Sequence, residues 1–134
     1  MSLAIVHARA ALGVEAPRVN IEVHLSGGLP GTNIVGLPEA AVRESRDRVR
    51  SALLNANFDW PQRRITINLA PADLPKEGAR FDLAIAIGIL AASGQVPIDV
   101  FDDYEFYGEL ALSGELRAIH GLLPAVIQAT RNGK

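Results

Sequence analysis

Pro75-Lys76-Glu77-Gly78-Ala79-Arg80 joins two stretches of different pattern. Residues 65–69 (Ile-Thr-Ile-Asn-Leu) alternate like a half-buried strand, whereas residues 81–92 are almost continuously apolar and long enough for a buried helix. We therefore expect a short loop that leads into a helix N-terminus. Such ends expose unsatisfied backbone N–H groups and partial positive charge, which suit an oxyanion or a phosphate. Arg80 stands at this point, and residues 79–92 contain no serine, threonine or cysteine.

The rest of the chain predicts strands before and between helices. Residues 3–9 and 18–25 are expected to be strands, because the second alternates apolar and polar side chains. A short strand at 33–35 precedes a helix opened by Pro38, whose apolar stripe ends near residue 57. Residues 105–110 and 116–119 predict a hairpin, and residues 122–130 a last helix. This order indicates one two-layer α+β domain over residues 1–134.

Composition agrees with a single domain that could bury one core. The chain has 134 residues, of which 49% are hydrophobic, and it has no cysteine, which excludes disulfides and thiolate metal sites. No basic stretch precedes the apolar residues at the N-terminus, and residues 81–92 are too short to span a bilayer, so we expect a cytoplasmic protein without membrane contact. The net charge of −2 means that any polyanion must bind through a local patch.

Residues 68–88 resemble the nucleophile loop and the following helix of the Lon protease domain. Downstream, Tyr107-Gly-Glu-Leu-Ala-Leu-Ser-Gly-Glu-Leu-Arg-Ala-Ile-His-Gly121 is similar to the strand, turn and strand that precede that domain's catalytic lysine. Laid over this pattern, the serine position falls on Arg80 and the lysine position on Ala125. The resemblance therefore implies a Lon-type fold from which both halves of the catalytic dyad are absent.

Further motifs extend a closer resemblance over almost the whole chain. Besides residues 67–80, they are Met1-Ser-Leu-Ala-Ile-Val-His7, Val23-His-Leu-Ser-Gly-Gly-Leu-Pro-Gly31, Val35-Gly-Leu-Pro-Glu39 and Arg46-Asp-Arg-Val-Arg-Ser-Ala52. Together they are similar to the N-terminal domain of the ComM/YifB family, magnesium-chelatase-like AAA+ ATPases in which a degenerate Lon-type domain precedes the motor.

That family implies a hexameric DNA helicase that acts in branch migration during natural transformation. ATP and Mg²⁺ are expected for the motor domain, which these 134 residues do not contain. The chain ends at Arg131-Asn-Gly-Lys134, directly after a predicted helix, where Lon-type domains continue into another strand. We therefore expect the fold to be truncated at its C-terminal end.

Few residues could support catalysis by another route. The sequence has no Gly-x-x-x-x-Gly-Lys-Ser/Thr phosphate loop. Lys76 is the only internal lysine, so a relocated serine–lysine pair would need Ser93 or Ser113 to approach it. The three histidines share no ligand spacing with one another or with a carboxylate; they are His7, His24 and His120. We expect no catalytic residue, no metal and no cofactor in this chain.

Arg80 is open to two interpretations. A cation at a helix start faces the unfavourable end of the helix dipole, at a cost of about 0.3–1 kcal/mol. Either Arg80 is compensated by an ion pair or hydrogen bonds with Asp73, Glu77 or Asp82, or its guanidinium and the helix N–H groups form an anion site, for example for a DNA phosphate.

Six arginines form a candidate nucleic-acid-binding patch, because planar guanidinium groups suit phosphates. They are Arg43, Arg46, Arg48, Arg50, Arg63 and Arg64. The same predicted helix also carries opposite charges at i,i+4, which would instead give a solvated, internally paired face. These pairs are Glu39–Arg43, Arg43–Asp47 and Glu44–Arg48. No aromatic residue is interleaved with the arginines, which argues against a sequence-reading platform for single strands.

The sequence thus predicts a non-catalytic module that serves a AAA+ DNA motor in assembly and in weak DNA engagement. Its expected partners are DNA, its own motor domain and further copies of the protein. Two alternatives remain open at this point: a purely structural oligomerisation domain, and a serine peptidase with a relocated dyad.

Overall fold

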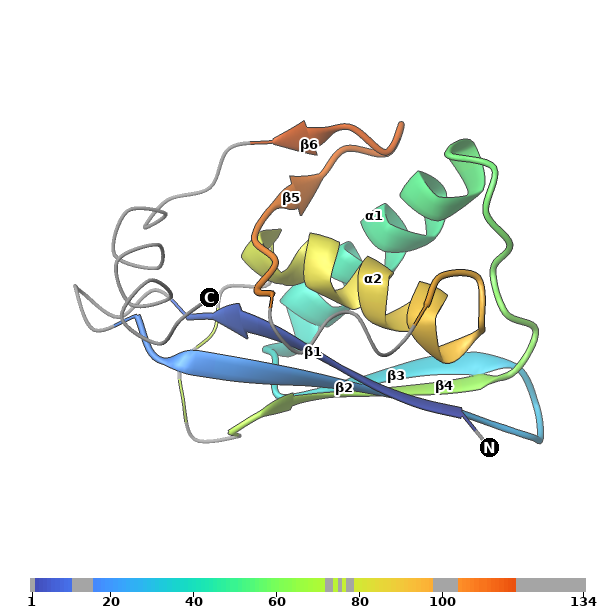
Figure 1. The fold of residues 1–134 in the computed structure, drawn as a ribbon, viewed down its shortest axis with the longest axis horizontal. Coiled ribbons are helices and arrows are strands. Elements are labelled where there is room, and N and C mark those ends of the chain that lie inside the picture. The colour runs from blue at the N-terminus through green and yellow to red at the C-terminus, as the bar shows by residue number, and fades with distance from the viewer. Residues whose placement is uncertain are drawn as a thin grey trace.

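The computed structural model describes residues 2–10, 16–71, 74, 76, 79–97 and 104–117. A four-stranded sheet carries two α-helices on one face, and a short hairpin lies beyond the helices (Figure 1). The elements are β1 (Ser2–Arg9), β2 (Arg18–Ser26), β3 (Gly31–Val35), α1 (Glu39–Asn55), β4 (Arg64–Ala70), the 3₁₀ turn η1 (Ala79–Phe81), α2 (Asp82–Ala92), β5 (Glu109–Leu110) and β6 (Leu116–Arg117). The predicted α+β class is confirmed.

The sheet has the order β1-β2-β4-β3, in which only the β3–β4 pair is parallel. Alternation along each strand buries one face: Ile21 lies opposite Leu69, Val23 opposite Ile67, and Leu25 opposite Ile65. The other face is polar along β2 and β4, where Asn68 donates to the Glu22 carboxylate at 2.8 Å, whereas β1 and β3 expose Leu3, Ile5 and Val35. The core therefore lies between the sheet and the helices.

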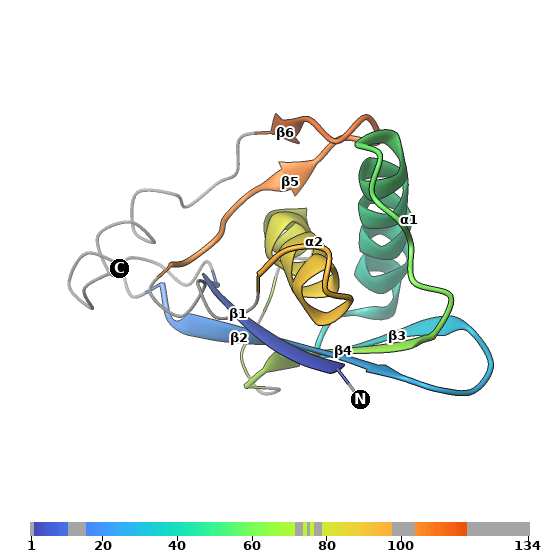
Figure 2. The ribbon, with the colours of Figure 1, turned by 45° about the vertical axis from the view of Figure 1, so that its right-hand side comes forward.

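Helix α2 lies across β1 and β2, with α1 standing beside it (Figure 2). Because α2 is enclosed by the sheet, by α1 and by the hairpin, almost all of its side chains are buried, as its continuous apolar sequence requires. Gly88 is the point of closest approach to the sheet: a Cβ there would lie 2.6 Å from Val23 Cγ2. The missing side chain sets the distance between helix and sheet.

The corner between β3 and α1 depends on Gly36, whose φ of +101° favours glycine. A Cβ at this position would also lie 2.6 Å from the Leu69 carbonyl oxygen. The sequence predicted Pro38 at the first helical position of α1. In the structure it is the N-cap, and the helix begins one residue later, at Glu39. The prediction was wrong by one residue because ψ of Pro38 is 149°, an extended value.

Two buried side chains tie residues 104–107 to the edge of the sheet. The Arg9 guanidinium donates to both carboxylate oxygens of Glu105, at 2.8 and 3.0 Å, and to the Ala16 carbonyl at 3.1 Å. Tyr107 donates its hydroxyl hydrogen to the same carboxylate, and burial raises the pKa of this hydroxyl. Next to them, the Phe106 N–H donates to the His7 carbonyl of β1.

The hairpin around Ser113-Gly114 is present, but its first strand, predicted for residues 105–110, covers only Glu109–Leu110; the last two residues of the predicted second strand lie outside the described residues. Glu105 makes only an isolated bridge to His7, so the strand does not begin there. The predicted helix at 122–130 and the lysine-equivalent position, Ala125, lie outside the described residues, as does the C-terminal end at which truncation was expected.

Candidate nucleic-acid interface

Arg80 lies on η1, immediately before α2, and its side chain is only 2% exposed. The backbone around it is fixed by Gly108, which donates to the Arg80 carbonyl at 3.2 Å and accepts from the Leu83 N–H at 3.1 Å. A guanidinium this deeply enclosed does not face solvent. The anion site at Arg80 therefore stays a prediction, and the structure shows only that this guanidinium is enclosed.

Asp82, one of the predicted partners of Arg80, bonds instead to Arg48. Arg48 on α1 donates from Nε to Asp82 Oδ2 at 2.6 Å and from Nη2 to Oδ1 at 3.2 Å. The Ser45 hydroxyl and the Leu110 N–H also donate to this carboxylate, at 2.9 and 3.2 Å. Two other predicted partners of Arg80, Asp73 and Glu77, lie outside the described residues.

This cluster holds a carboxylate with no exposed surface at the junction of α1, α2 and β5. Desolvation by burial raises the pKa of Asp82, while hydrogen bonds from Arg48, Leu110 and Ser45 oppose that rise. The same hydrogen bond raises the pKa of Arg48, against partial desolvation. Because its charge is compensated inside the fold, Arg48 belongs to the structure of the domain and leaves the predicted DNA-binding set.

The predicted i,i+4 ion pairs along α1 do not form. Within the part of the chain that the structure describes, the ion pair between two residues of this helix joins the neighbours Arg46 and Asp47, with Nε and Oδ1 3.8 Å apart. The expectation of an internally paired face was wrong because the side chains turn to other neighbours: Arg48 goes inward to Asp82, while Arg46 and Arg50 turn to a pocket.

Arg46 and Arg50 line the same pocket, which has a volume of about 350 Å³. Trp60 forms another part of its wall, and the Arg50 guanidinium carbon lies 5.9 Å from the centre of the Trp60 ring, a cation–π contact. Helix spacing could not indicate this aromatic partner, because Trp60 follows α1 by several residues. The Trp60-Pro61 pair in the loop after the helix was the available signal.

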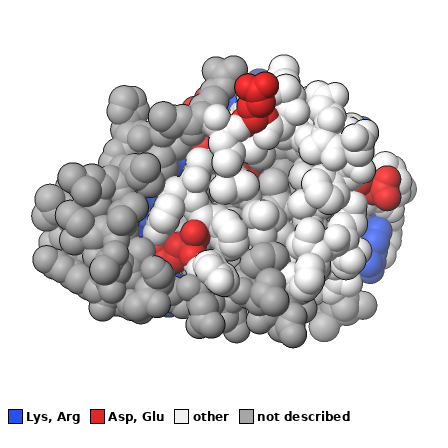
Figure 3. All heavy atoms as spheres, turned by 45° about the horizontal axis from the view of Figure 1, so that its top comes forward, with Lys and Arg blue, Asp and Glu red and all other residues white. Residues whose placement is uncertain are grey.

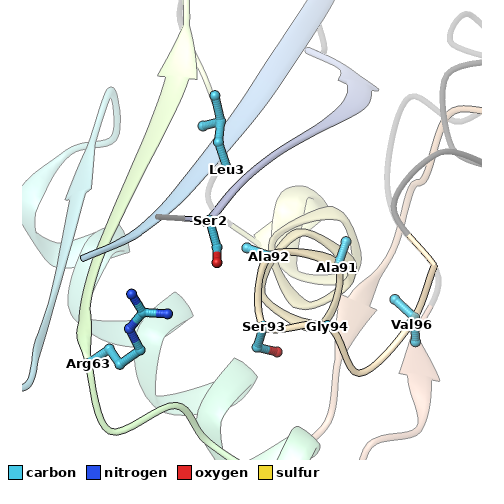
Figure 4. A pocket seen from close by; sticks show the side chains of 8 residues that line it. All are labelled: Ser2, Leu3, Arg63, Ala91, Ala92, Ser93, Gly94 and Val96. Atoms are coloured by element: carbon cyan, nitrogen blue, oxygen red, sulfur yellow. The ribbon is translucent and has the colours of Figure 1, made fainter. Parts of the chain in front are cut away.

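Arg63 lies in the next hollow, beside the C-terminal end of α2. Its guanidinium and the Ser2 hydroxyl turn toward the same space, close to Ser93 (Figure 4). This pocket measures about 490 Å³, and a neighbouring one of about 250 Å³ also contains Arg63 and Ser93. Within the described residues, Arg63 has no carboxylate at ion-pair distance.

The six predicted arginines therefore do not form one continuous surface. Arg46, Arg50 and Arg63 line adjoining pockets, Arg48 is partly buried and paired with Asp82, and Arg43 and Arg64 are exposed on α1 and at the start of β4. The face over the helices and the hairpin is largely uncharged, with basic groups only at its margins (Figure 3). The candidate interface is thus the loop at 59–63 with its flanking arginines.

No serine–lysine pair is assembled among the described residues. Lys76 Nζ donates to the carbonyls of Pro71 and Leu74, at 2.5 and 2.9 Å. The Ser93 hydroxyl bonds to the Leu90 carbonyl, and the Ser113 hydroxyl accepts from the Glu115 N–H. His7 bonds to Asn20 through its Nδ1 at 2.8 Å, whereas His120 lies outside the described residues.

The described residues offer neither a metal-binding cluster nor a membrane-spanning helix. They contain no group of three or more side chains that could hold a metal ion. None of the helices among them combines the length and the apolar character needed to cross a membrane.

Comparison with known proteins identifies the family of this chain. The chain belongs to the family described as subunit ChlI of Mg-chelatase, whose sequence model matches residues 21–134.

Among individual relatives, competence protein ComM of Haemophilus influenzae is 62% identical over 132 residues, which are 98% of this chain and 26% of ComM. Protein YifB of Escherichia coli is 58% identical over 134 residues, 100% of this chain and 26% of YifB. The resemblance to the ComM/YifB family is confirmed, and the chain spans about a quarter of the length of these relatives. Lon protease of Mesomycoplasma hyopneumoniae is 31% identical over 77 residues, 58% of this chain and 9% of that protein.

Proposed function

We propose that this chain is a non-catalytic module of a larger AAA+ ATPase, in which it engages DNA and contributes to ring assembly. The observation that carries the proposal is the position of Arg46, Arg50 and Arg63 in adjoining pockets around one loop. Competence protein ComM, similar over 98% of this chain, supports a role within a larger protein. More specifically, we propose that the larger protein is a hexameric, cytoplasmic helicase that acts in branch migration. Its motor domain, which would bind ATP and Mg²⁺, lies outside these residues.

The proposed module has a degenerate Lon-type fold. The partial similarity to Lon protease supports this assignment, because it combines with a mixed sheet and two helices on one face. Arg80 occupies the nucleophile position, is buried, and has neither a hydroxyl nor a thiol. Acyl transfer needs such a nucleophile with an adjacent base. We therefore propose that the domain positions a substrate and does not cut it.

DNA contact by a single copy is weak and independent of sequence. The chain carries a net charge of −2, so only the local arginines attract phosphates, and this attraction extends about one Debye length, roughly 8 Å at physiological salt. Non-specific binding of this kind is no tighter than about 10⁻⁴ to 10⁻⁶ M at physiological salt. A ring that repeats the patch would raise the apparent affinity through multivalency.

An apolar surface supports the proposed role in assembly. Asn55 at the end of α1 donates to the Leu112 carbonyl at 2.7 Å, which places the hairpin turn against this helix end. Leu54, Leu112 and Leu116 are all about half exposed. Exposed apolar side chains of this size are typical of contact surfaces. Together with the largely uncharged face in Figure 3, they offer a surface for the motor domain or for another copy.

The proposal is tested by DNA binding at low salt. A variant with Arg46, Arg50, Arg63 and Arg64 changed to glutamate should lose binding while keeping its melting temperature within a few degrees. Arg18→Glu, an exposed change on β2, is the control for charge alone and should lose much less. Concentration-dependent self-association without DNA binding would favour a purely structural oligomerisation domain. Peptide turnover that disappears in Lys76→Ala or Ser113→Ala would favour a peptidase.

A further inference from the structure

Two like charges are held together in the pocket next to Trp60. Arg46 and Arg50 are one turn apart on α1 and line the same 350 Å³ space. Cations at i,i+4 repel each other, so this arrangement costs free energy without a counter-charge. Asp47 also lines the pocket and pairs with Arg46 at 3.8 Å, whereas within the described residues no carboxylate forms an ion pair with Arg50, so the two arginines leave the pocket with a net positive charge. The pocket therefore has the electrostatics of an anion site.

The pocket walls are supported from behind. The Arg50 guanidinium lies over the Trp60 ring, which is itself half-buried against the core. The adjoining Asp59 is fixed to the end of α2, because its N–H donates to Gln95 Oε1 and its carbonyl accepts from Gln95 Nε2, both at 2.9 Å. The cation and the aromatic ring are thus held in place before any ligand arrives, which reduces the entropy cost of binding.

The site continues beyond this pocket. Pro61 lines both the Arg46/Arg50 pocket and the next one, which also contains Arg63, and Arg63 in turn lines the 490 Å³ pocket beside α2. Three adjoining hollows therefore follow the loop: the first is lined by Arg46, Arg50 and the Asp47 carboxylate, and Arg63 is shared by the other two, of which the smaller is also lined by Asp59. A single phosphate would occupy one hollow, whereas a chain of phosphates would match the series.

We propose that this series of pockets binds single-stranded nucleic acid, with phosphates at Arg46, Arg50 and Arg63 and a base against the Arg50–Trp60 pair. This inference rests on the proposed function and specifies its ligand. Bases of single strands stack on aromatic rings and on guanidinium planes, and arginine grooves follow their backbone. A duplex keeps its bases stacked inside a wide, convex helix, so it can touch the rim of these pockets but cannot place a base in them.

Trp60 is the only tryptophan of the 134-residue chain, so its fluorescence reports on this pocket directly. We would titrate the chain with a thymidine oligonucleotide, with a duplex of equal length, and with inorganic phosphate at the same total phosphate concentration. The expected result is saturable quenching by the single strand, weakened by salt, with an affinity about tenfold higher than that of the duplex, because one stacked base contributes this order of affinity.

Arg50→Gln should abolish the quenching, whereas Arg50→Lys should keep part of the affinity and lose the preference for single strands. Arg18→Gln is the matched control, and thermal melting verifies that each variant is folded. Equal affinity for the single strand and the duplex would overturn this inference. If the variant with Arg46, Arg50, Arg63 and Arg64 changed to glutamate then bound neither of them, the proposed function would remain intact. Absence of any DNA binding would remove both. If inorganic phosphate quenched the fluorescence as strongly as the single strand, the pocket would be an isolated phosphate site. That result would contradict the proposal that the three pockets together bind a nucleic-acid strand.

Discussion

The Arg48 guanidinium and the Asp82 carboxylate form a two-bond ion pair between α1 and α2, with the shorter contact at 2.6 Å. Asp82 is the first residue of α2, where a negative charge also interacts favourably with the helix dipole. The pair joins α1 to α2, which stand beside each other in Figure 2, and α1 in turn carries Arg46 and Arg50, which line the pocket next to Trp60.

Changing Arg48 to methionine should make stability strongly dependent on pH. Burial already raises the folded-state pKa of Asp82, and Arg48 opposes this rise, so the variant raises that pKa further. A carboxyl whose folded pKa lies above its unfolded value, about 3.9, favours folding below that value and loses this contribution as pH rises. The stability difference between the variant and wild type should therefore be small near pH 4 and grow toward pH 7. Urea unfolding at several pH values measures it, and a constant difference would contradict this role of Arg48.

Changing Glu105 to glutamine should destabilise the edge of the sheet. The Arg9 side chain is only 4% exposed, and its two bonds to the Glu105 carboxylate are its charge compensation among the described residues. Removing one partner of a buried pair costs about 3–5 kcal/mol. Glu115→Gln changes an exposed glutamate and is expected to stay within about 0.5 kcal/mol of wild type. Equal unfolding free energies for the two variants would show that the pair contributes little.

Changing Gly88 to alanine should lower stability, although alanine is the better helix former by about 1 kcal/mol. The new Cβ would lie 2.6 Å from Val23 Cγ2, on a stiff β-branched side chain in β2, so α2 must move away from the sheet. We expect a net loss of about 1–3 kcal/mol, as for other overpacked cores. Gly27→Ala has no atom within 4 Å of its added Cβ and serves as the control. Thermal melts of both variants decide the point, and a more stable Gly88→Ala variant would refute this packing.

Changing Arg80 to serine should not create a peptidase. In the proposed Lon-type fold, the substitution would place a hydroxyl at the nucleophile position, but Ala125 would stand at the position of the catalytic lysine, so no base would be supplied there. Because Arg80 is among the largest fully buried side chains, its removal should instead cost about 2–4 kcal/mol through lost packing and hydrogen bonds. Cleavage of an unfolded protein substrate, followed on a gel, is the measurement. Turnover that survives repurification would contradict the assignment.

The strands and α2 could be predicted because alternation and continuous apolar character are local properties of the sequence. Val19, Ile21 and Val23 indicate the buried face of β2 without knowledge of its neighbours. The length of the hairpin could not be predicted in the same way, because residues 104–107 bond to β1 through Glu105 instead of extending β5.

The partners of the arginines were less accessible, since they depend on tertiary contacts. Arg48 bonds to a residue 34 positions away, although an acid stands four positions before it on its own helix. Arg50 meets Trp60 only because the chain turns back after α1, at Asn57 with φ +68°. Sequence spacing identified a basic cluster, whereas the fold decides which of its members reach solvent together.

The most direct test of the central claim is the salt dependence of DNA binding by wild type and by the variant with Arg46, Arg50, Arg63 and Arg64 changed to glutamate. Each phosphate neutralised on a single strand contributes a slope of about −0.7 to log K against log salt. Three arginines in the pockets therefore predict a slope of about −2 for wild type and no measurable binding for the variant. Equal affinities of the two proteins, or binding that is independent of salt, would contradict the claim that these arginines engage DNA.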